Sequence, residues 1–178
     1  MIYFDFIVTL NDEKQYTYGC EVVEDIETLD ELKQMAIDEY DEEDEEAASL
    51  IDKSNVSVQV DAEGELYSYL AGRFTENTAD DIINILDQLT TDNYDEDQVI
   101  AYLECFDLEN FDLRKVSDKM FGEGSFSCDA DVAEYYLNNF RDDIPEDIKN
   151  VIDYEAAYTY FDLNGDLYES RGFYFWAY

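Results

Sequence analysis

The sequence predicts an α+β protein: an elongated chain of small modules, with antiparallel sheets at both ends and a helical middle. Apolar residues alternate with polar ones over residues 2–10 and 16–22, a pattern typical of half-buried strands. Between residues 78 and 106 the apolar residues instead recur at helical spacing. The hydrophobic share of 46% and the aromatic share of 16% favour folded cores, because acidic disordered chains are poor in aromatic residues.

The first expected module, residues 1–72, contains three or four strands and one helix. Residues 2–10 and 16–22 are expected to pair as antiparallel strands across a turn at 11–14. Alternating valines predict a further strand at 56–60. This combination favours a small sheet covered by a single helix.

A helix is expected to begin after Thr28, because Thr28 and Glu31 have the spacing of a capping box. It leads into Asp38–Glu46, where eight of nine residues are acidic. A helical run would carry about one charge per 1.7 Å, close to the linear charge density of duplex DNA. Like charges four residues apart cost about 0.2–0.5 kcal/mol each in a helix. The sequence therefore leaves helix and loop open for this run.

Residues 73–118 are expected to form the helical middle module. Thr78 and Asp95 have the positions of helix caps, and apolar residues at 108–113 predict a third short helix. The basic residues Arg114, Lys115 and Lys119 form an island that we interpret as an internal ion-pair partner.

Residues 119–178 are expected to form a C-terminal α+β module. Helices are predicted from about residue 129 and from Pro145, since proline favours the first helical turn. Asn164-Gly165 is a strong hairpin signal and predicts a turn between two strands. The ring-rich residues 173–178 are interpreted as the last strand of the same sheet.

The charge of the chain is its most unusual property. It has 47 acidic and 10 basic residues and no histidine, which gives a net charge of −37. Such a charge destabilises the compact state by self-repulsion, and it exceeds the magnitude of about 2–8 that keeps a small domain soluble. A polyanion repels nucleic acid and anionic membranes, so we expect neither as a partner. The expected partner is a strongly basic protein surface.

Several classes of function are disfavoured by the residues present. Without histidine, Ser-His and Cys-His nucleophile pairs and histidine metal sites are excluded. Gly122-Glu123-Gly124 marks a loop but is too short for a nucleotide fingerprint. Asp162–Asp166 begins like a calcium loop, yet Leu167 and Phe173 stand where glycine and glutamate are required. We therefore expect no enzymatic activity, no cofactor and no dedicated metal site, although weak divalent binding along the acidic run stays open.

The cysteines and the apolar stretches bear on location. Cys20, Cys105 and Cys128 are widely spaced, which favours small buried residues in a reducing cytosol. The N-terminal residues lack the basic region of a signal peptide, and no apolar stretch approaches the 18 residues of a membrane span. A cytoplasmic location is expected.

Segments downstream of residue 99 carry a family resemblance. They are Ala101–Phe111 (AYLECFDLENF), Asp131–Tyr136 (DVAEYY), Ile144–Glu146 (IPE), Ile152–Ala156 (IDYEA) and Asp162-Leu163-Asn164-Gly165. In order and spacing they resemble the C-terminal part of the ArdA family of antirestriction proteins, over a little under half of the chain. The resemblance implies three small domains, a curved homodimer, and carboxylates that imitate bent DNA in the groove of type I restriction–modification enzymes. The ring-rich end of this chain departs from the family pattern, which leaves other targets open.

We therefore expect a DNA-mimic inhibitor that shields phage or mobile DNA in a bacterial host. The alternatives are an inhibitor of a CRISPR effector that uses the same mimicry, an acidic chaperone of basic proteins, and a halophilic surface. The carboxylates expected to bind the partner lie on the acidic run and the middle helices. They are Asp38, Glu39, Asp41, Glu42, Glu43, Asp44, Glu45, Glu46, Asp80, Asp81, Asp87, Asp92, Asp95, Glu96, Asp97, Glu104, Asp107 and Glu109.

Overall fold

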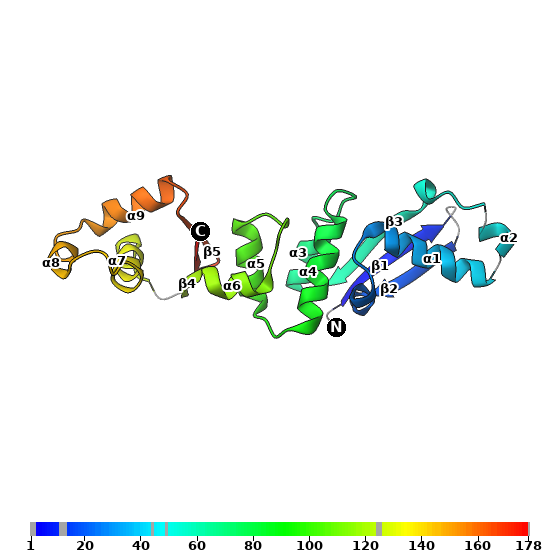
Figure 1. Cartoon of the computed structure of the whole chain (residues 1–178), viewed down its shortest axis with the longest axis horizontal. Helices are drawn as coiled ribbons and strands as arrows, with labels where there is room; N and C mark the ends of the chain where they lie inside the picture. Colours follow the sequence, from blue (N-terminus) through cyan, green and yellow to red (C-terminus); the bar gives the residue numbers. More distant parts are fainter. Residues whose placement is uncertain (1–2, 11–13, 44, 49, 124–125, 178) are drawn as a thin grey trace. The chain divides into compact units, whose positions relative to one another are not determined.

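The computed structural model confirms the α+β class, because its described residues form helices and two three-stranded antiparallel sheets (Figure 1). By its internal contacts the chain divides into two compact units. The expected middle module is shared between these units, and the division into three modules stays a prediction.

No helix within the described ranges is long and apolar enough to cross a membrane. The structure describes residues 3–10, 14–43, 45–48, 50–123 and 126–177. The first unit is Met1–Glu96 with Asp107–Leu113, and the second is Asp97–Phe106 with Arg114–Tyr178.

The sheet of the first unit has the strand order β2-β1-β3. The central strand β1 (Tyr3–Leu10) pairs antiparallel with β2 (Lys14–Gly19) and with β3 (Ser57–Glu63). Its alternation predicted the buried face correctly. The buried residues of β1 are Phe4, Phe6, Val8 and Leu10.

The second strand ends earlier than expected. Residues Cys20–Asp25 form the 3-10 helix η1 instead of continuing β2, so the strand predicted to residue 22 is wrong there. Val23 of this helix is buried. The tight winding of a 3-10 helix turns the chain away from the sheet edge and buries Val23. An alternating pattern alone does not predict this change of structure.

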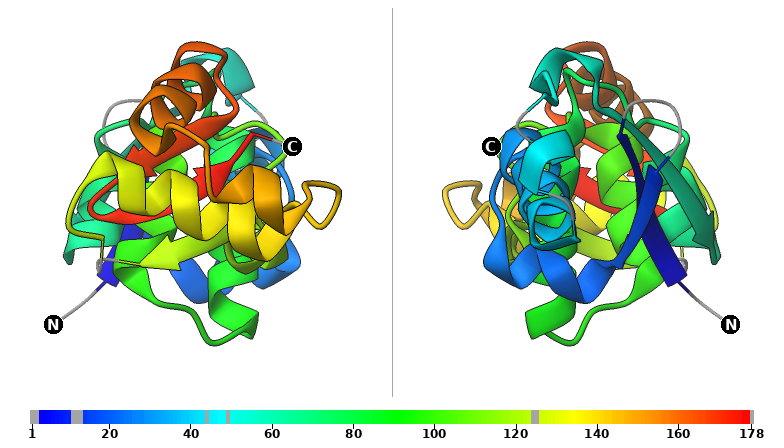
Figure 2. Two further views of the ribbon diagram at one scale, coloured as in Figure 1. Left: turned by 90° about the vertical axis from the view of Figure 1, so that its left-hand side faces the viewer. Right: turned by 90° about the vertical axis from the view of Figure 1, so that its right-hand side faces the viewer.

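The capping box of helix α1 (Leu29–Glu43) is confirmed. The Glu31 amide donates to Thr28 Oγ1 at 3.2 Å, and the Thr28 amide donates to Glu31 Oε2 at 3.2 Å. Leu29, Leu32 and Ala36 are the buried residues of α1. In the right-hand view of Figure 2, α1 (light blue) runs beside the blue strands of this sheet.

Short elements and one long helix complete the first unit. The long helix α4 (Ala79–Thr91) buries three isoleucines and two leucines. Thr78 precedes α4 as expected, but its hydroxyl donates to the Arg73 carbonyl at 2.6 Å and makes no capping bond. The shorter elements are α2 (Glu45–Ala48), η2 (Lys53–Asn55) and α3 (Glu65–Ala71).

The segment after α5 (Glu96–Cys105) returns to the first unit through Gln88 of α4. Gln88 Oε1 accepts from the Leu113 amide at 2.8 Å, and Gln88 Nε2 donates to the Phe111 carbonyl at 3.2 Å. The helix expected at 108–113 begins only at its end, because α6 spans Leu113–Lys119. Residues 108–112 are not helical. Within them the Phe111 amide donates to the Leu108 carbonyl at 3.2 Å, and the Phe111 carbonyl accepts from Gln88.

The second unit packs helices on both faces of a sheet with the strand order β4-β6-β5. Tyr102 of α5 and Phe106, which directly follows that helix, lie against Phe175, with ring centroids 5.7 and 6.1 Å away. On the other face the ring centroid of Trp176 lies 4.2 Å from that of Phe121 and 3.7 Å from that of Tyr136 of α7. The left-hand view of Figure 2 shows α7 (yellow) and α9 (orange) in front of the red strands. The elements are β4 (Met120–Glu123), α7 (Asp129–Phe140), α8 (Glu146–Lys149), α9 (Tyr154–Leu163), β5 (Leu167–Ser170) and β6 (Phe173–Trp176).

The hairpin expected at Asn164-Gly165 is wrong. Tyr154–Leu163 form helix α9, which ends in a Schellman motif. In this motif the Gly165 amide donates to the Asp162 carbonyl at 3.0 Å, and the Asp166 amide donates to the Phe161 carbonyl at 2.9 Å. Gly165 adopts the positive φ of 68° that this motif requires. The same helix removes the calcium-loop geometry considered for this segment.

The hairpin lies a few residues further on. Arg171 and Gly172 have φ of 55° and 80°, and they connect the paired residues Ser170 and Phe173. Two positive φ values in a two-residue loop define a type I′ turn, whose twist suits a β-hairpin. The loop expected at Gly122 and Gly124 is wrong at Gly122, which lies in β4, whereas Gly124 lies outside the described residues.

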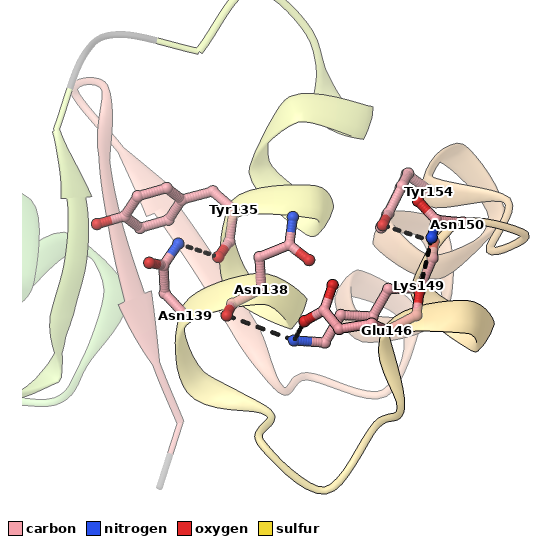
Figure 3. A network of polar contacts seen from close by, with 7 residues as sticks. All are labelled: Tyr135, Asn138, Asn139, Glu146, Lys149, Asn150 and Tyr154. Carbon is pink, nitrogen blue, oxygen red and sulfur yellow. Dashed lines mark hydrogen bonds and ion pairs between the residues drawn. The ribbon is translucent and has the colours of Figure 1, made fainter.

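Lys149 is the charged side chain that the described part of the second unit buries, with 6% exposure. Its Nζ lies 3.5 Å from the Asn138 carbonyl in the last turn of α7 and 3.6 Å from Glu146 Oε1 (Figure 3). The Tyr154 hydroxyl donates to the Lys149 carbonyl at 2.8 Å. A cation at a helix C-terminus is stabilised by the helix dipole, so Lys149 joins α7 to α8 and α9.

We expect Gly165→Ala to destabilise the protein by about 1–2 kcal/mol, because a Cβ disfavours the left-handed conformation. Space is not the obstacle, since the new Cβ would meet its nearest neighbour, Tyr168 Oη, at 3.6 Å. Gly72→Ala is the matched control, because Gly72 has a helical φ of −64°. Urea unfolding followed by circular dichroism measures both. Equal effects of the two substitutions would contradict the αL role of Gly165.

Candidate functional site

The acidic run continues α1 as a helix as far as Glu43. Three of its carboxylates accept hydrogen bonds from neighbouring side chains: Asp38 from Gln34 at 2.6 Å, Glu39 from the Tyr18 hydroxyl at 2.8 Å, and Glu43 from Lys14 at 2.7 Å. Asp41 and Glu42 are exposed. Five carboxylates on consecutive turns of an ordered helix form the densest charged surface in this part of the chain.

The remaining residues of the run are placed only in part. Glu46 lies in α2 and is exposed, whereas Asp44 and the side chain of Glu45 lie outside the described residues. The like-charged pairs 38/42 and 39/43 are each expected to cost about 0.2–0.5 kcal/mol in α1. Acids in the last turn also oppose the negative end of the helix dipole. The run is therefore helical against a local electrostatic cost.

A second acidic region is a hollow of about 560 Å³ beside η1 and the first turns of α4. Asp80, Asp81 and Asp87 line it, as the sequence placed them among the partner-binding acids. Three further carboxylates, from Glu24, Asp25 and Glu27, complete a lining in which six side chains are acidic. These three were missed because a strand was expected to run to residue 22 and no element was predicted between it and Thr28. The signal available in the sequence was the acidic composition of residues 21–27.

Asp80 also has a structural role. Its Oδ1 accepts from the Leu29 amide at 2.7 Å, which satisfies a free N–H at the start of α1. Asp80 also borders a smaller hollow of about 400 Å³ with Thr28, Asp30 and Lys33. This carboxylate therefore joins α4 to α1 in addition to contributing surface charge.

Asp81 is in a different electrostatic situation. Partial burial, with the neighbouring carboxylates of Glu109 and Asp80, raises the pKa of Asp81 above its ordinary value. The ionised form of Asp81 is therefore disfavoured in the folded protein. A cation that entered the hollow would relieve this cost.

On α5, two of the expected partner-binding acids have an internal partner. Arg171 Nη2 lies 3.2 Å from Glu104 Oε1, and Arg171 Nη1 lies 3.8 Å from Asp97 Oδ1. The Ser170 hydroxyl also donates to Glu104. The type I′ turn of the β5–β6 hairpin is thereby fastened to α5, so Glu104 and Asp97 are less available to a partner than their sequence positions indicate.

The other expected acids lie near the ends of helices. Asp92 occupies the C-cap position of α4, Asp95 directly precedes α5 and Glu96 begins it. Asp107 and Glu109 lie in the segment that returns to the first unit, and both are exposed. Asp80, Asp81 and Asp87 therefore line one hollow, and Glu109 lies close to Asp81. The acids of the run lie on a different helix, α1.

Many of the basic side chains have internal partners. Lys14 contacts Glu43, and Arg141 forms a bidentate pair with Asp143 at 2.8 and 2.9 Å. This pair lowers the pKa of Asp143 to about 2, chiefly through the hydrogen bond from Arg141. Lys119 of the basic island points inward, but its described partners are the Ala177 carbonyl and the ring of Phe106. Because the chain has 47 acids and 10 bases, its basic side chains can neutralise only a minority of its carboxylates.

Metal ligation and nucleophilic chemistry depend on how Cys, Asp and Glu side chains are grouped and ionised. Among the described residues no three His, Cys, Asp or Glu side chains are grouped closely enough to hold a metal ion. Burial and the nearby Glu104 and Glu169 raise the pKa of the Cys105 thiol to about 11, so this thiol is protonated and weakly nucleophilic at neutral pH. Separated carboxylates are instead suited to receive several lysine or arginine side chains.

Comparison with known proteins gives no assignment. No family model matches the chain, and no curated protein or solved structure is detectably similar to it.

Asp80→Asn and Asp81→Asn should have opposite effects on stability, although each removes one charge. We expect Asp80→Asn to destabilise, because the amide is a weaker acceptor for the Leu29 amide than the carboxylate. Asp81→Asn should stabilise at pH 7, because the folded state holds the ionised carboxyl at a raised pKa. The gain should shrink as the pH falls through the raised pKa toward the ordinary value of 3.8.

The measurement is urea unfolding of both variants and the parent protein at pH 7 and at lower pH. General relief of repulsion is the same in the two variants, so their difference reports the local contacts. Equal stabilisation by both substitutions would contradict the role of Asp80 in α1.

Proposed function

We propose that the chain is a DNA mimic that inhibits a bacterial defence complex by occupying its DNA-binding groove. The observation that carries the proposal is the exposure of closely spaced carboxylates on ordered helices, above all the five acids of Asp38–Glu43 on α1. Lys14 is the basic side chain with a described ion pair to this segment. An ordered array of this kind presents negative charge at fixed positions.

The physical basis is competition for the same basic side chains. DNA binds a basic groove largely through its phosphates, and the released counterions make that affinity strongly dependent on salt. A folded polyanion that pairs with the same lysine and arginine residues excludes DNA from the groove. Carboxylates that are ordered before binding lose less conformational entropy than those of a disordered tail. This favours mimicry over an acidic chaperone of basic proteins.

The proposed target is a type I restriction–modification enzyme. Support comes from the resemblance of residues 101–165 to the C-terminal part of the ArdA family, whose members act on such enzymes. The proposed setting is the cytoplasm of a bacterial host during entry of phage or mobile DNA. No chemical reaction is proposed for the chain. A CRISPR effector, which also has a basic groove, is the alternative target of the same mechanism.

The direct test is competition between the chain and duplex DNA for a purified type I restriction–modification complex. The expected result is that the chain displaces labelled DNA and that excess DNA displaces the chain. A parallel assay with a purified CRISPR effector distinguishes the two targets. A complex that holds the chain and DNA at the same time would contradict mimicry.

A variant series tests the contribution of α1. Asp38→Asn, Glu39→Gln, Asp41→Asn, Glu42→Gln and Glu43→Gln together should weaken binding roughly tenfold or more, because an exposed ion pair contributes about 0.2–1 kcal/mol. Binding should not be abolished, since the hollow beside η1 and α4 is unchanged. The control exchanges Asp and Glu at the same five positions and keeps the charge, so its affinity should stay close to that of the parent chain.

A further inference from the structure

Helix α1 has two unequal halves. Its buried residues, Leu29, Leu32 and Ala36, all lie in the first half, and its N-terminus is capped by Thr28 and Asp80. Acids in the first turn of a helix are favourable to its dipole. The second half, Asp38–Glu43, contains no fully buried side chain and carries acids at the end where the dipole disfavours them. Packing therefore stabilises the first half much more than the second.

Two side chains of β2 attach this second half to the sheet. Lys14 Nζ contacts Glu43 Oε2 at 2.7 Å, and the Tyr18 hydroxyl donates to Glu39 Oε2 at 2.8 Å. Both acceptors lie on α1 four residues apart, and both donors lie on β2 four residues apart. Lys14 Nζ also lies 5.2 Å from the centre of the Tyr16 ring, which stabilises the cation at this position. The cation of Lys14 thus offsets repulsion at the end of the helix.

We propose that the acidic half of α1 is a helix whose folding depends on cations. When external cations are scarce, the helix unwinds from Glu43 back toward Ile37, while the capped and buried half stays folded. Salt or the basic side chains of a partner neutralise the carboxylates and complete the helix. The ordered helix of the structure is then the form that a basic surface selects.

The physical reason is the range of the repulsion. Helix neighbours four residues apart have Cβ atoms about 5–6 Å from one another. The screening length is about 30 Å at 0.01 M salt and about 8 Å at 0.15 M, so dilute buffer leaves the repulsion within α1 unscreened. Local opening of this kind occurs where a segment has few buried apolar contacts.

A cation-dependent helix would add a regulatory step to the proposed mimicry. Only this biological meaning of the helix rests on the proposed function. In dilute salt, binding to a basic groove would order Asp38–Glu43, so the affinity there would include the work of completing the helix. At salt that already completes the helix, the carboxylates are ordered before binding, as the proposed function assumes. A partner surface with few basic residues would fail to complete it, which adds selectivity for densely basic grooves.

The test is residue-resolved amide hydrogen exchange of the whole chain between about 0.01 M and 0.5 M NaCl, a range that spans weak to strong screening. Protection at residues 38–43 should rise about tenfold relative to residues 30–36 of the same helix, because several unfavourable charge pairs are screened together. Spermine added in dilute buffer should produce the same rise. Equal protection of the two halves at the lowest salt would overturn the proposal.

Matched variants separate the local contact from the total charge. Lys14→Met should lower protection at residues 38–43 in dilute buffer, and added salt should restore it. Tyr18→Phe should lower it without a change of charge. Lys115→Met is the control, because it removes one exposed cation from α6 in the second unit. An equal loss in Lys14→Met and Lys115→Met would overturn the proposal in favour of a general charge effect.

The exchange experiment needs no defence complex. A chain that shows the salt response but fails to displace DNA from its targets would refute the proposed function and leave the cation-dependent helix intact. A chain that displaces DNA without the salt response would refute the switch alone.

Discussion

Repulsion among carboxylates is the constraint under which both units fold, since 47 acids face 10 bases. Each unit offsets this repulsion by burial. In the first unit β1 and α4 supply fully buried aliphatic and aromatic side chains, and in the second unit rings such as Phe121 and Trp176 pack at 4.2 Å. Aromatic residues bury large areas in small modules, which explains how an acidic chain of this size retains folded cores. Most of the surface charge is then not needed to hold the fold together.

The few cations and some of the acids are placed where they stabilise local structure. Arg171 fastens a hairpin turn to α5, and Lys149 joins α7 to α8. Asp80 and Asp153 accept from amides at the starts of α1 and α9, where negative charge is favourable. In the second half of α1 the acids instead lie at the unfavourable end of a helix, with Asp41, Glu42 and Glu43 in the last turn. This electrostatic cost is not required by the fold. Such a cost is expected where the acids bind a partner.

Local patterns in the sequence predicted the fold where a single periodicity dominated. The alternation of β1 and the capping box at Thr28 and Glu31 were confirmed in the predicted places. The Asn164-Gly165 pair gave a wrong prediction because glycine at positive φ occurs both in hairpin turns and at helix ends. The packing of Tyr158 and Phe161 of α9 against the core of the second unit decides for the helix end. The hollow beside η1 and α4 could not be predicted, since it depends on residues more than 50 positions apart that tertiary packing brings together.

The central claim is that the surface carboxylates oppose folding and promote binding. One protein sample tests it across a salt series, by its melting temperature and by its affinity for a type I restriction–modification complex. Added salt should raise the melting temperature, because it screens self-repulsion. The same salt should weaken binding with a steep linear dependence of log K on log salt, as for DNA itself. An affinity that is independent of salt would contradict the claim, whatever the melting temperature does.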